Sequence, residues 1–194
     1  MEQKINAGTL RDELRILSLA YESETDTWSW KGGDLIRAQA TVGERSNLFS
    51  RVGIGARDVS FVVRHRPALT LDHALVWKTG GAWEHCFLTA IIPVNPLYDT
   101  LHCARVSTVE CLADYDRPVP GPHFPGVLTE KYVGHTQLTP LAVNTLDYVL
   151  VTPKCVTLTP GSLVRVGDKV WHVLLGHVLD GWKNEYEIER VSDL

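Results

Sequence analysis

Two His-Cys pairs are the residues whose types and spacing come closest to a chemical site in this sequence. They are His85-Cys86 and His102-Cys103, on either side of an expected hairpin with Asn95 at its tip. In such a hairpin Cys86 and Cys103 lie roughly opposite each other, and one face could offer two thiolates. The histidines would point to the other face, whereas zinc needs four converging ligands. We therefore expect no metal, but buried thiols and exposed histidines.

Motifs of known catalytic sites are missing from the sequence. The chain has no GxSxG, no P-loop, no GxGxxG, no CxxC and no HExxH. Local spacing places no carboxylate or nucleophile beside His172 or His177. Glu185, Glu187 and Glu189 could suggest a cation site, but a spacing of two is that of a strand's solvated face. The sequence therefore predicts a protein that is not an enzyme and has no cofactor.

One segment lacks periodicity and lies between two predicted strands. Residues 43–57 combine glycines, arginines and a few apolar side chains. A loop of this length inside a compact domain is usually functional or mobile. Its arginines can bind phosphate or a neighbour's carboxylates, and its glycines can act as hinges. The candidate residues of this loop are Gly43, Glu44, Arg45, Leu48, Phe49, Arg51, Gly53, Gly55 and Arg57.

The rest of the chain is arranged around two stretches, 58–107 and 147–192, that resemble each other. The matches are Asp58-Val-Ser-Phe-Val-Val with Asp147-Tyr-Val-Leu-Val-Thr, Leu75-Val76 with Leu163-Val164, Trp83 with Trp171, and Arg105-Val-Ser with Arg190-Val-Ser. The insertions fall in connections, as in a duplicated unit; chance similarity of two β-rich segments is the alternative. Duplication predicts that Trp83 and Trp171 occupy equivalent places.

Each stretch has the pattern of a short β-meander. Glycine-containing turns at Thr79-Gly80-Gly81 and Gly167-Asp168 indicate hairpins, because these residues tolerate positive φ. Residues 34–42 alternate as a strand, which Gly32-Gly33 separates from an extended Trp28-Ser-Trp30. We predict an all-β fold of two tandem small β-barrel units. These are residues 1–107, with the long loop, and residues 108–194, shorter and with a proline-rich lead-in.

Composition sets the broad class of the protein. The chain has 194 residues, 44% of them hydrophobic, and four cysteines without paired spacing, which we expect to be reduced. We see no apolar run of membrane-span length and no signal peptide, so we expect synthesis in the cytoplasm. Residues 1–107 hold 12 Lys and Arg against 12 Asp and Glu; the remainder holds 7 against 11. This balance argues against a protein that grips duplex DNA.

The order of motifs in residues 6–107 resembles the head-closure (stopper, or head–tail joining) proteins of long-tailed bacteriophages. The matching motifs are Ala7-Gly8-x-Leu10-Arg11, Thr27-Trp28, Ala38-x-Ala40-x-Val42, Gly43-Glu44-Arg45, Val59 to Arg66-Pro67, and Leu69-Thr70. Residues 147–191 resemble the same family, above all from Leu158 to Trp171. Two features depart from it: Ser23-Glu-Thr-Asp26 lacks the glycine of the family's first turn, and the second copy is an addition.

The resemblance implies a virion protein, assembled in the host cytoplasm, that forms a ring of six subunits in the phage neck. Portal and adaptor would lie above the ring, and the tail or tail-terminator protein below. Packaged DNA would pass through without sequence-specific binding, and the loop at residues 43–57 would project into the channel and help to retain it. The alternative for the loop is docking outward on the portal or tail. We also expect several of the aromatic residues Trp28, Trp30, Phe49 and Trp77 at subunit boundaries.

Two other classes of function compete with the connector. One is a tandem β-barrel binding module that attaches another virion protein, such as a decoration or tail-fibre protein. The other is a hydrolase built on a β scaffold. Self-association separates them, because a ring-former assembles, a binding module stays monomeric, and a hydrolase shows a cleft of convergent polar groups.

Overall fold

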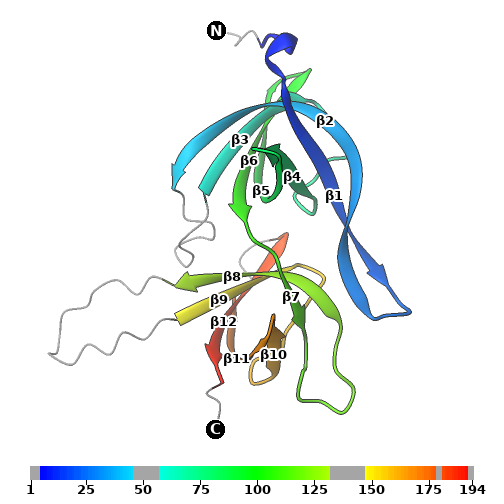
Figure 1. Cartoon of the computed structure of the whole chain (residues 1–194), viewed down its shortest axis with the longest axis vertical. Coiled ribbons are helices and arrows are strands. Elements are labelled where there is room, and N and C mark those ends of the chain that lie inside the picture. The colour runs from blue at the N-terminus through cyan, green and yellow to red at the C-terminus, as the bar shows by residue number, and fades with distance from the viewer. Residues whose placement is uncertain (1–4, 46–56, 132–146, 178–180, 192–194) are drawn as a thin grey trace, which may run out of the picture. The chain divides into compact units, whose positions relative to one another are not determined.

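The computed structural model describes residues 5–45, 57–131, 147–177 and 181–191 (Figure 1). Within them the only helical element is the 3₁₀ helix η1 (Ala7–Thr9), and all other regular elements are strands, which confirms the all-β class. No helix in this part of the chain is long and apolar enough to span a membrane. Two compact units are present, with described residues up to 108 in the first and those from 109 in the second.

The first unit is a closed barrel of six antiparallel strands. Its pairings follow the order β1-β4-β5-β6-β3-β2, and β2 pairs back with β1. Closure leaves no free edge within the barrel, since every strand has two neighbours. The strands are β1 (Asp12–Glu22), β2 (Thr27–Arg45), β3 (Arg57–Arg64), β4 (Ala74–Thr79), β5 (Ala82–Asn95) and β6 (Tyr98–Val106).

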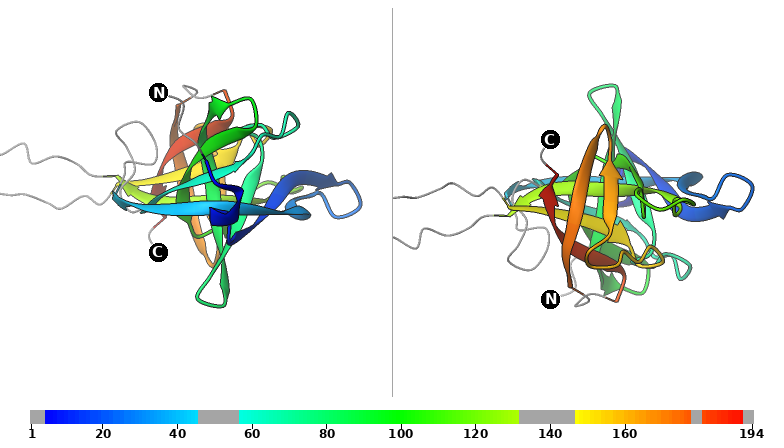
Figure 2. Two further views of the ribbon diagram at one scale, coloured as in Figure 1. Left: turned by 90° about the horizontal axis from the view of Figure 1, so that it is seen from above. Right: turned by 90° about the horizontal axis from the view of Figure 1, so that it is seen from below.

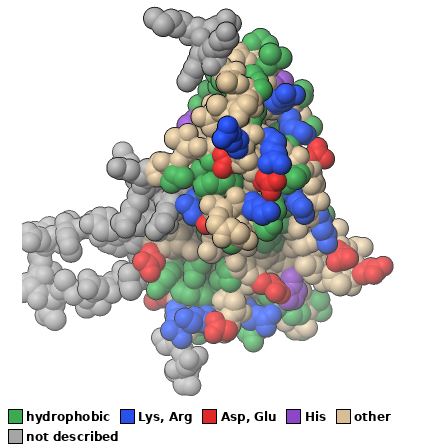
Figure 3. Space-filling view, turned by 45° about the horizontal axis from the view of Figure 1, so that its top comes forward, with side chains coloured by type: hydrophobic (Ala, Val, Ile, Leu, Met, Phe, Trp, Pro, Cys, Tyr) green, Lys and Arg blue, Asp and Glu red, His purple; other side chains and the backbone are tan. Residues whose placement is uncertain are grey.

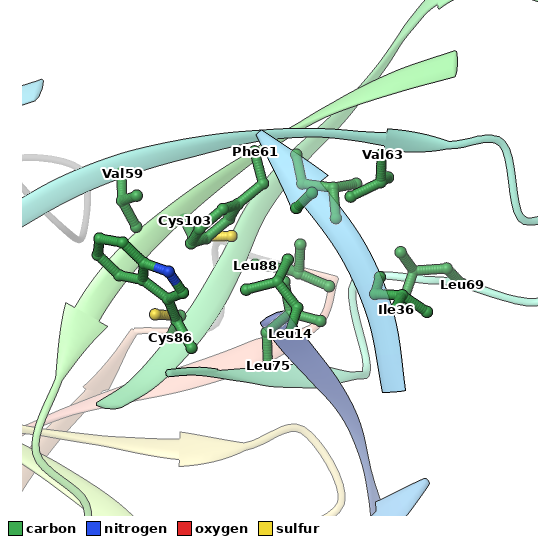
Figure 4. Close-up of a cluster of buried hydrophobic side chains, with 13 residues drawn as sticks. Leu14, Ile36, Val59, Phe61, Val63, Leu69, Leu75, Cys86, Leu88 and Cys103 are labelled. Atoms are coloured by element: carbon green, nitrogen blue, oxygen red, sulfur yellow. The ribbon is translucent and has the colours of Figure 1, made fainter. Parts of the chain in front are cut away.

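The core of this barrel follows from strict alternation along its strands. On β3, Val59, Phe61 and Val63 are buried while the residues between them face outward (Figure 4). Phe61 meets Trp77 of β4 edge to face, with ring centroids 5.5 Å apart. Every strand of the barrel contributes to this cluster, so its burial holds the closed sheet together.

The hairpin of β1 and β2 extends beyond the barrel. Strand β1 pairs with β2 along its whole length, but with β4 only through Leu14–Leu17. Residues 18–22 and 27–31 are therefore paired with each other alone among the described strands; with the turn at 23–26 they form what we call the arm. Figures 1 and 2 show the arm projecting from the other strands of its unit.

Strand β2 runs through Gly32-Gly33, so the predicted break at these glycines is wrong. A bulge between Arg15 and Leu17 of β1 lies opposite them. A side chain at Gly32 would come within 3.2 Å of the Arg15 side chain, and one at Gly33 within 3.4 Å of a backbone oxygen. The glycines therefore accommodate the bulge and do not end the strand.

The second unit also contains six antiparallel strands. They pair in the order β8-β7-β10-β11-β12-β9, and β9 also pairs with β8. Gly126 of β8 allows close packing, because an added Cβ would lie 2.9 Å from both the Cys111 sulfur and a Leu150 methyl carbon. The strands are β7 (Val109–Leu112), β8 (His123–Lys131), β9 (Asp147–Pro153), β10 (Leu163–Val166), β11 (Lys169–His177) and β12 (Lys183–Arg190).

Buried polar side chains fix the segment that follows β9. The Asn184 amide donates hydrogen bonds to the carbonyl oxygens of Lys154 (3.2 Å) and Val156 (2.9 Å). The Tyr186 hydroxyl accepts one from the Leu158 backbone N–H (3.0 Å). Because buried carbonyl and N–H groups need partners, these two side chains of β12 determine the path of residues 154–158.

Trp83 and Trp171 do not occupy equivalent places, contrary to the prediction from the repeat. Both follow two-residue turns, at Gly80-Gly81 and Gly167-Asp168, but Trp83 is in the second cross-strand pair from its turn and Trp171 in the third. One residue of register turns a side chain to the other face of a sheet. Trp83 is therefore 44% exposed, whereas Trp171 is 3% exposed.

The inward tryptophan of the first hairpin is Trp77. It lies in the third cross-strand pair from the turn, opposite Glu84, as Trp171 lies opposite Val164. Trp77 meets Phe61 edge to face, and Trp171 meets Tyr148 in the same way. Each unit thus buries one indole in the third cross-strand pair from the turn. In the first unit it comes from the strand before the turn, and in the second from the strand after it.

Candidate functional site

The predicted loop at residues 43–57 is shorter than expected at both ends. Strand β2 continues through Gly43 and Glu44 to Arg45, β3 begins at Arg57, and these two arginines pair after a bulge. Glycine suits this place, because a Cβ at Gly43 would lie 3.2 Å from the Asp58 Cβ. The other candidates, Leu48, Phe49, Arg51, Gly53 and Gly55, lie outside the described residues.

An ion pair lies near the barrel end from which β2 and β3 lead into this segment. Arg105, which pairs with Arg57, forms a salt bridge with Glu84, and its guanidinium carbon is 5.5 Å from the Trp77 ring centroid. Both charged groups are partly exposed, which keeps them hydrated. The pair thus caps the aromatic core with charge and holds Trp77 in place.

The two predicted thiols of the barrel are buried, as expected, but they are not opposite each other. Cys86 faces Arg105 across the strands, and Cys103 faces Leu88. Burial is the main cause that raises the pKa of Cys86 to about 12; nearby Arg105 lowers it and Glu84 raises it. Among the described residues no three His, Cys, Asp or Glu side chains are grouped as a metal site.

Thiol reactivity tests this arrangement. Cys155 is exposed, whereas Cys86, Cys103 and Cys111 are buried, and burial raises the pKa of Cys86 and Cys111 to about 12. At pH 8 we expect an alkylating reagent to modify Cys155 alone, because Cys86 and Cys111 stay protonated and all three buried thiols are shielded. Mass spectrometry before and after unfolding in urea measures this, with Cys155→Ser as the control. Rapid labelling of Cys86 or Cys111 in the native protein would contradict the structure.

One histidine has an acidic partner that local spacing did not reveal. His177 Nε2 lies 2.9 Å from Glu187 Oε1 on the neighbouring strand β12, and both side chains are partly buried. The middle glutamate of the predicted solvated row is therefore part of a cross-strand pair. Only the pairing of β11 with β12 brings these residues together, and the sequence did not specify that register.

The arm has one apolar face. Its cross-strand pairs Leu19–Trp30 and Tyr21–Trp28 point the same way, with the Tyr21 and Trp28 rings 4.9 Å apart. Trp30, nearest the barrel, contacts the rings of His85 and Phe87. Tyr21 is 49% exposed. The arm is thus anchored at its base and presents aromatic surface toward its end.

The turn of the arm is acidic. Glu22, Glu24 and Asp26 are exposed there, and no basic residue lies between positions 16 and 30. The Tyr21 hydroxyl donates a hydrogen bond to Asp26 Oδ1 (2.7 Å), which raises the pKa of Tyr21. We call these three acidic residues the acidic tip.

A basic and aromatic surface lies on the outer face of β1, β2, β4 and β5. The side chains of Arg15 and Lys78 lie 5.5 and 5.9 Å from the Trp83 ring centroid. Glu13 bridges Arg37 (3.1 Å) and Lys78 (3.4 Å). In the space-filling view, Lys and Arg side chains gather on the face that is drawn (Figure 3). We define the Trp83 patch as Glu13, Arg15, Leu35, Arg37, Lys78 and Trp83.

The aromatic residues expected at subunit boundaries have different environments. Trp77 is buried in the barrel core, so it is not one of the residues available for a boundary; its spacing of two from buried Leu75 indicates the inward face. Trp28 and Trp30 are half-buried on the arm, and Phe49 lies outside the described residues. Trp83 is a surface residue that was not predicted from the sequence. Trp83 lies three positions before buried Cys86, and an odd separation along a strand places two side chains on opposite faces.

No protein-family model matches the chain, and no curated protein shows significant similarity to it.

Proposed function

We propose that this protein is a structural connector of a tailed-phage neck. In this proposal it forms a ring, usually of six subunits, between the portal and adaptor above and the tail or tail-terminator protein below. The motif order of residues 6–107 supports the proposal, and so does the closed small barrel in which those residues fold. DNA passes through the ring without sequence-specific binding, and the protein acts without a cofactor.

The observation that carries this proposal is the arm. Among the described strands, the two strands of the arm pair only with each other, and an isolated hairpin is marginally stable in water. The arm also has an aromatic face. A ring-former needs such a surface, because each subunit must contact the next through two different regions.

The second unit is, in this proposal, a second small barrel that duplicates the first. Its strand order corresponds to that of the first unit when β7 to β12 are matched with β1 to β6 in sequence. Both hairpins also bury an indole in the third cross-strand pair from the turn, although from opposite strands. Because the resembled family usually has one unit, the second would supply contacts beyond those of a single unit.

Residues 43–57 act as the channel loop in this proposal. Arg45, Arg51 and Arg57 meet DNA phosphate or acidic neighbours, and Gly53 and Gly55 supply hinge freedom. The alternative to a loop in the channel is a loop that points outward and docks on the portal or the tail. The pairing of Arg45 with Arg57 holds the two ends of the segment together at one end of the barrel, as either arrangement requires.

Assembly of the purified protein tests the proposal. We expect rings with six-fold symmetry in negative-stain images, and native mass spectrometry at micromolar concentration should show six chains. Addition of the portal complex should increase the ring fraction if the portal acts as a template. A protein that stays monomeric alone and with the portal would contradict the connector function.

A binding module is the second candidate, and exposed apolar residues of the second unit favour it. Leu174 and Leu175 of β11 are about half exposed, at 48% and 51%. Adjacent exposed leucines on a strand suit a contact with another virion protein, such as a decoration or tail-fibre protein. A strictly monomeric chain that binds such a protein would favour this function over the connector.

A further inference from the structure

We propose that the arm of one subunit docks its acidic tip on the Trp83 patch of a second copy of this chain. The inference rests on the proposed ring and names the contact that would build it. It starts from two surfaces of the first unit whose chemistry is complementary. One is acidic and aromatic, the other basic and aromatic.

The acidic tip is held in a defined shape for a contact. Tyr21 stacks near Trp28 and hydrogen-bonds Asp26, which has a positive φ of 48°. The turn therefore presents Glu22 and Glu24 beside an exposed aromatic ring. Three carboxylates at the end of an apolar hairpin call for a partner that offers cations and a flat apolar surface.

The Trp83 patch offers that chemistry. Its three cations, Arg15, Arg37 and Lys78, are accompanied by the single carboxylate of Glu13, so its net charge is positive. Trp83 is 44% exposed and Leu35 is 51% exposed, which provides apolar area between the charges. Arginine over an indole leaves guanidinium N–H groups free to bind carboxylates.

A tip cannot reach the patch of its own chain. Arg15 and Glu22 are on one continuous strand, seven residues apart, which is roughly 23 Å in extended backbone. The strand is paired over this length, so it cannot fold back. The contact must therefore be between chains. It joins two different surfaces, so it can repeat head to tail, and it gives a ring where the rotation from one subunit to the next closes.

Charge exchange between two variants tests the contact. The tip variant carries Glu22→Lys and Glu24→Lys and keeps Asp26 for its bond to Tyr21. The patch variant carries Arg15→Glu and Lys78→Glu. Each variant alone opposes like charges at every contact, and we expect its association to be about 100-fold weaker than that of the wild-type chain. Mixed in equal amounts, they should form rings of alternating subunits, because each tip then meets an opposite charge.

Controls separate the contact from general effects of charge and folding. The variant Asp168→Lys with Glu189→Lys reverses two exposed carboxylates of the second unit and should assemble as the wild type does. Circular dichroism should show unchanged strand content in all variants. Wild-type association should weaken between low and high salt, since exposed charges are screened.

The outcomes separate this contact from the connector function itself. Rings formed by both variants alone overturn the contact and leave the connector standing; a wild-type chain that never assembles overturns both. Failure of the mixture to assemble overturns the contact. Binding of a 30-base-pair DNA duplex by the wild type, lost in the patch variant, would assign the patch to nucleic acid and overturn the proposal.

Discussion

Replacement of Phe61 by alanine is expected to lower the free energy of unfolding by about 3–5 kcal/mol. Phe61 is completely buried in the barrel core, edge to face with Trp77. It lies opposite Ala40 on β2 and Leu101 on β6. Six hydrogen-bonded strands surround the site and cannot collapse into the space, so the cost includes both lost burial and a cavity.

Urea denaturation followed by circular dichroism measures this loss. The matched control is Val62→Ala, one residue along the same strand but on the outward face. We expect it to cost less than about 1 kcal/mol. Equal losses for the two substitutions would show that Phe61 does not face the core.

The second large effect is expected in the other unit. Replacement of Trp171 by alanine should cost about 3–5 kcal/mol, because its indole is buried against Tyr148 with ring centroids 4.8 Å apart. Among the described residues, nothing accepts a hydrogen bond from its Nε1–H. Trp171→Phe should therefore cost much less, since it keeps an aromatic ring and removes an unsatisfied donor.

Thermal and urea unfolding of both Trp171 variants test this difference. His172→Ala serves as the control, because His172 is the next residue and is exposed. A loss for Trp171→Phe as large as that for Trp171→Ala would mean that the indole N–H has an acceptor. A negligible loss for both would contradict the burial of Trp171.

Alternation along single strands allowed much of the barrel to be predicted. Apolar residues recur at every second position in Val59, Phe61 and Val63, which predicts a strand with one buried face. The glycine-containing turns indicated the positions of both central hairpins. To match the residues of two hairpins, the positions of their turns must also be known, because the turn sets the register of the two strands. Sequence identity aligned Trp83 with Trp171, whereas the turns Gly80-Gly81 and Gly167-Asp168 align Trp77 with Val164. An identical residue carried less information than the position of the turn.

The candidate surfaces could not be predicted to the same extent. The Trp83 patch draws on four strands, and neither Arg15 nor Arg37 is near Trp83 in the sequence. Its formation depends on the pairing of β1 with both β2 and β4, a choice among many possible partners. The arm begins where the pairing of β4 with β1 ends. The composition of β1 does not reveal this point, so the arm could not be predicted from the sequence.

The strand order of the first unit has a consequence for synthesis on the ribosome. The hairpin of β1 and β2 is local and can form early, but β6 pairs with both β3 and β5 and comes last. At about 5–20 residues per second, the nascent chain therefore keeps open strand edges for several seconds before Val106 emerges. Neighbouring chains on one polysome can pair through these edges. Slow translation between β2 and β6 would therefore lengthen the time for which these edges stay open to another chain.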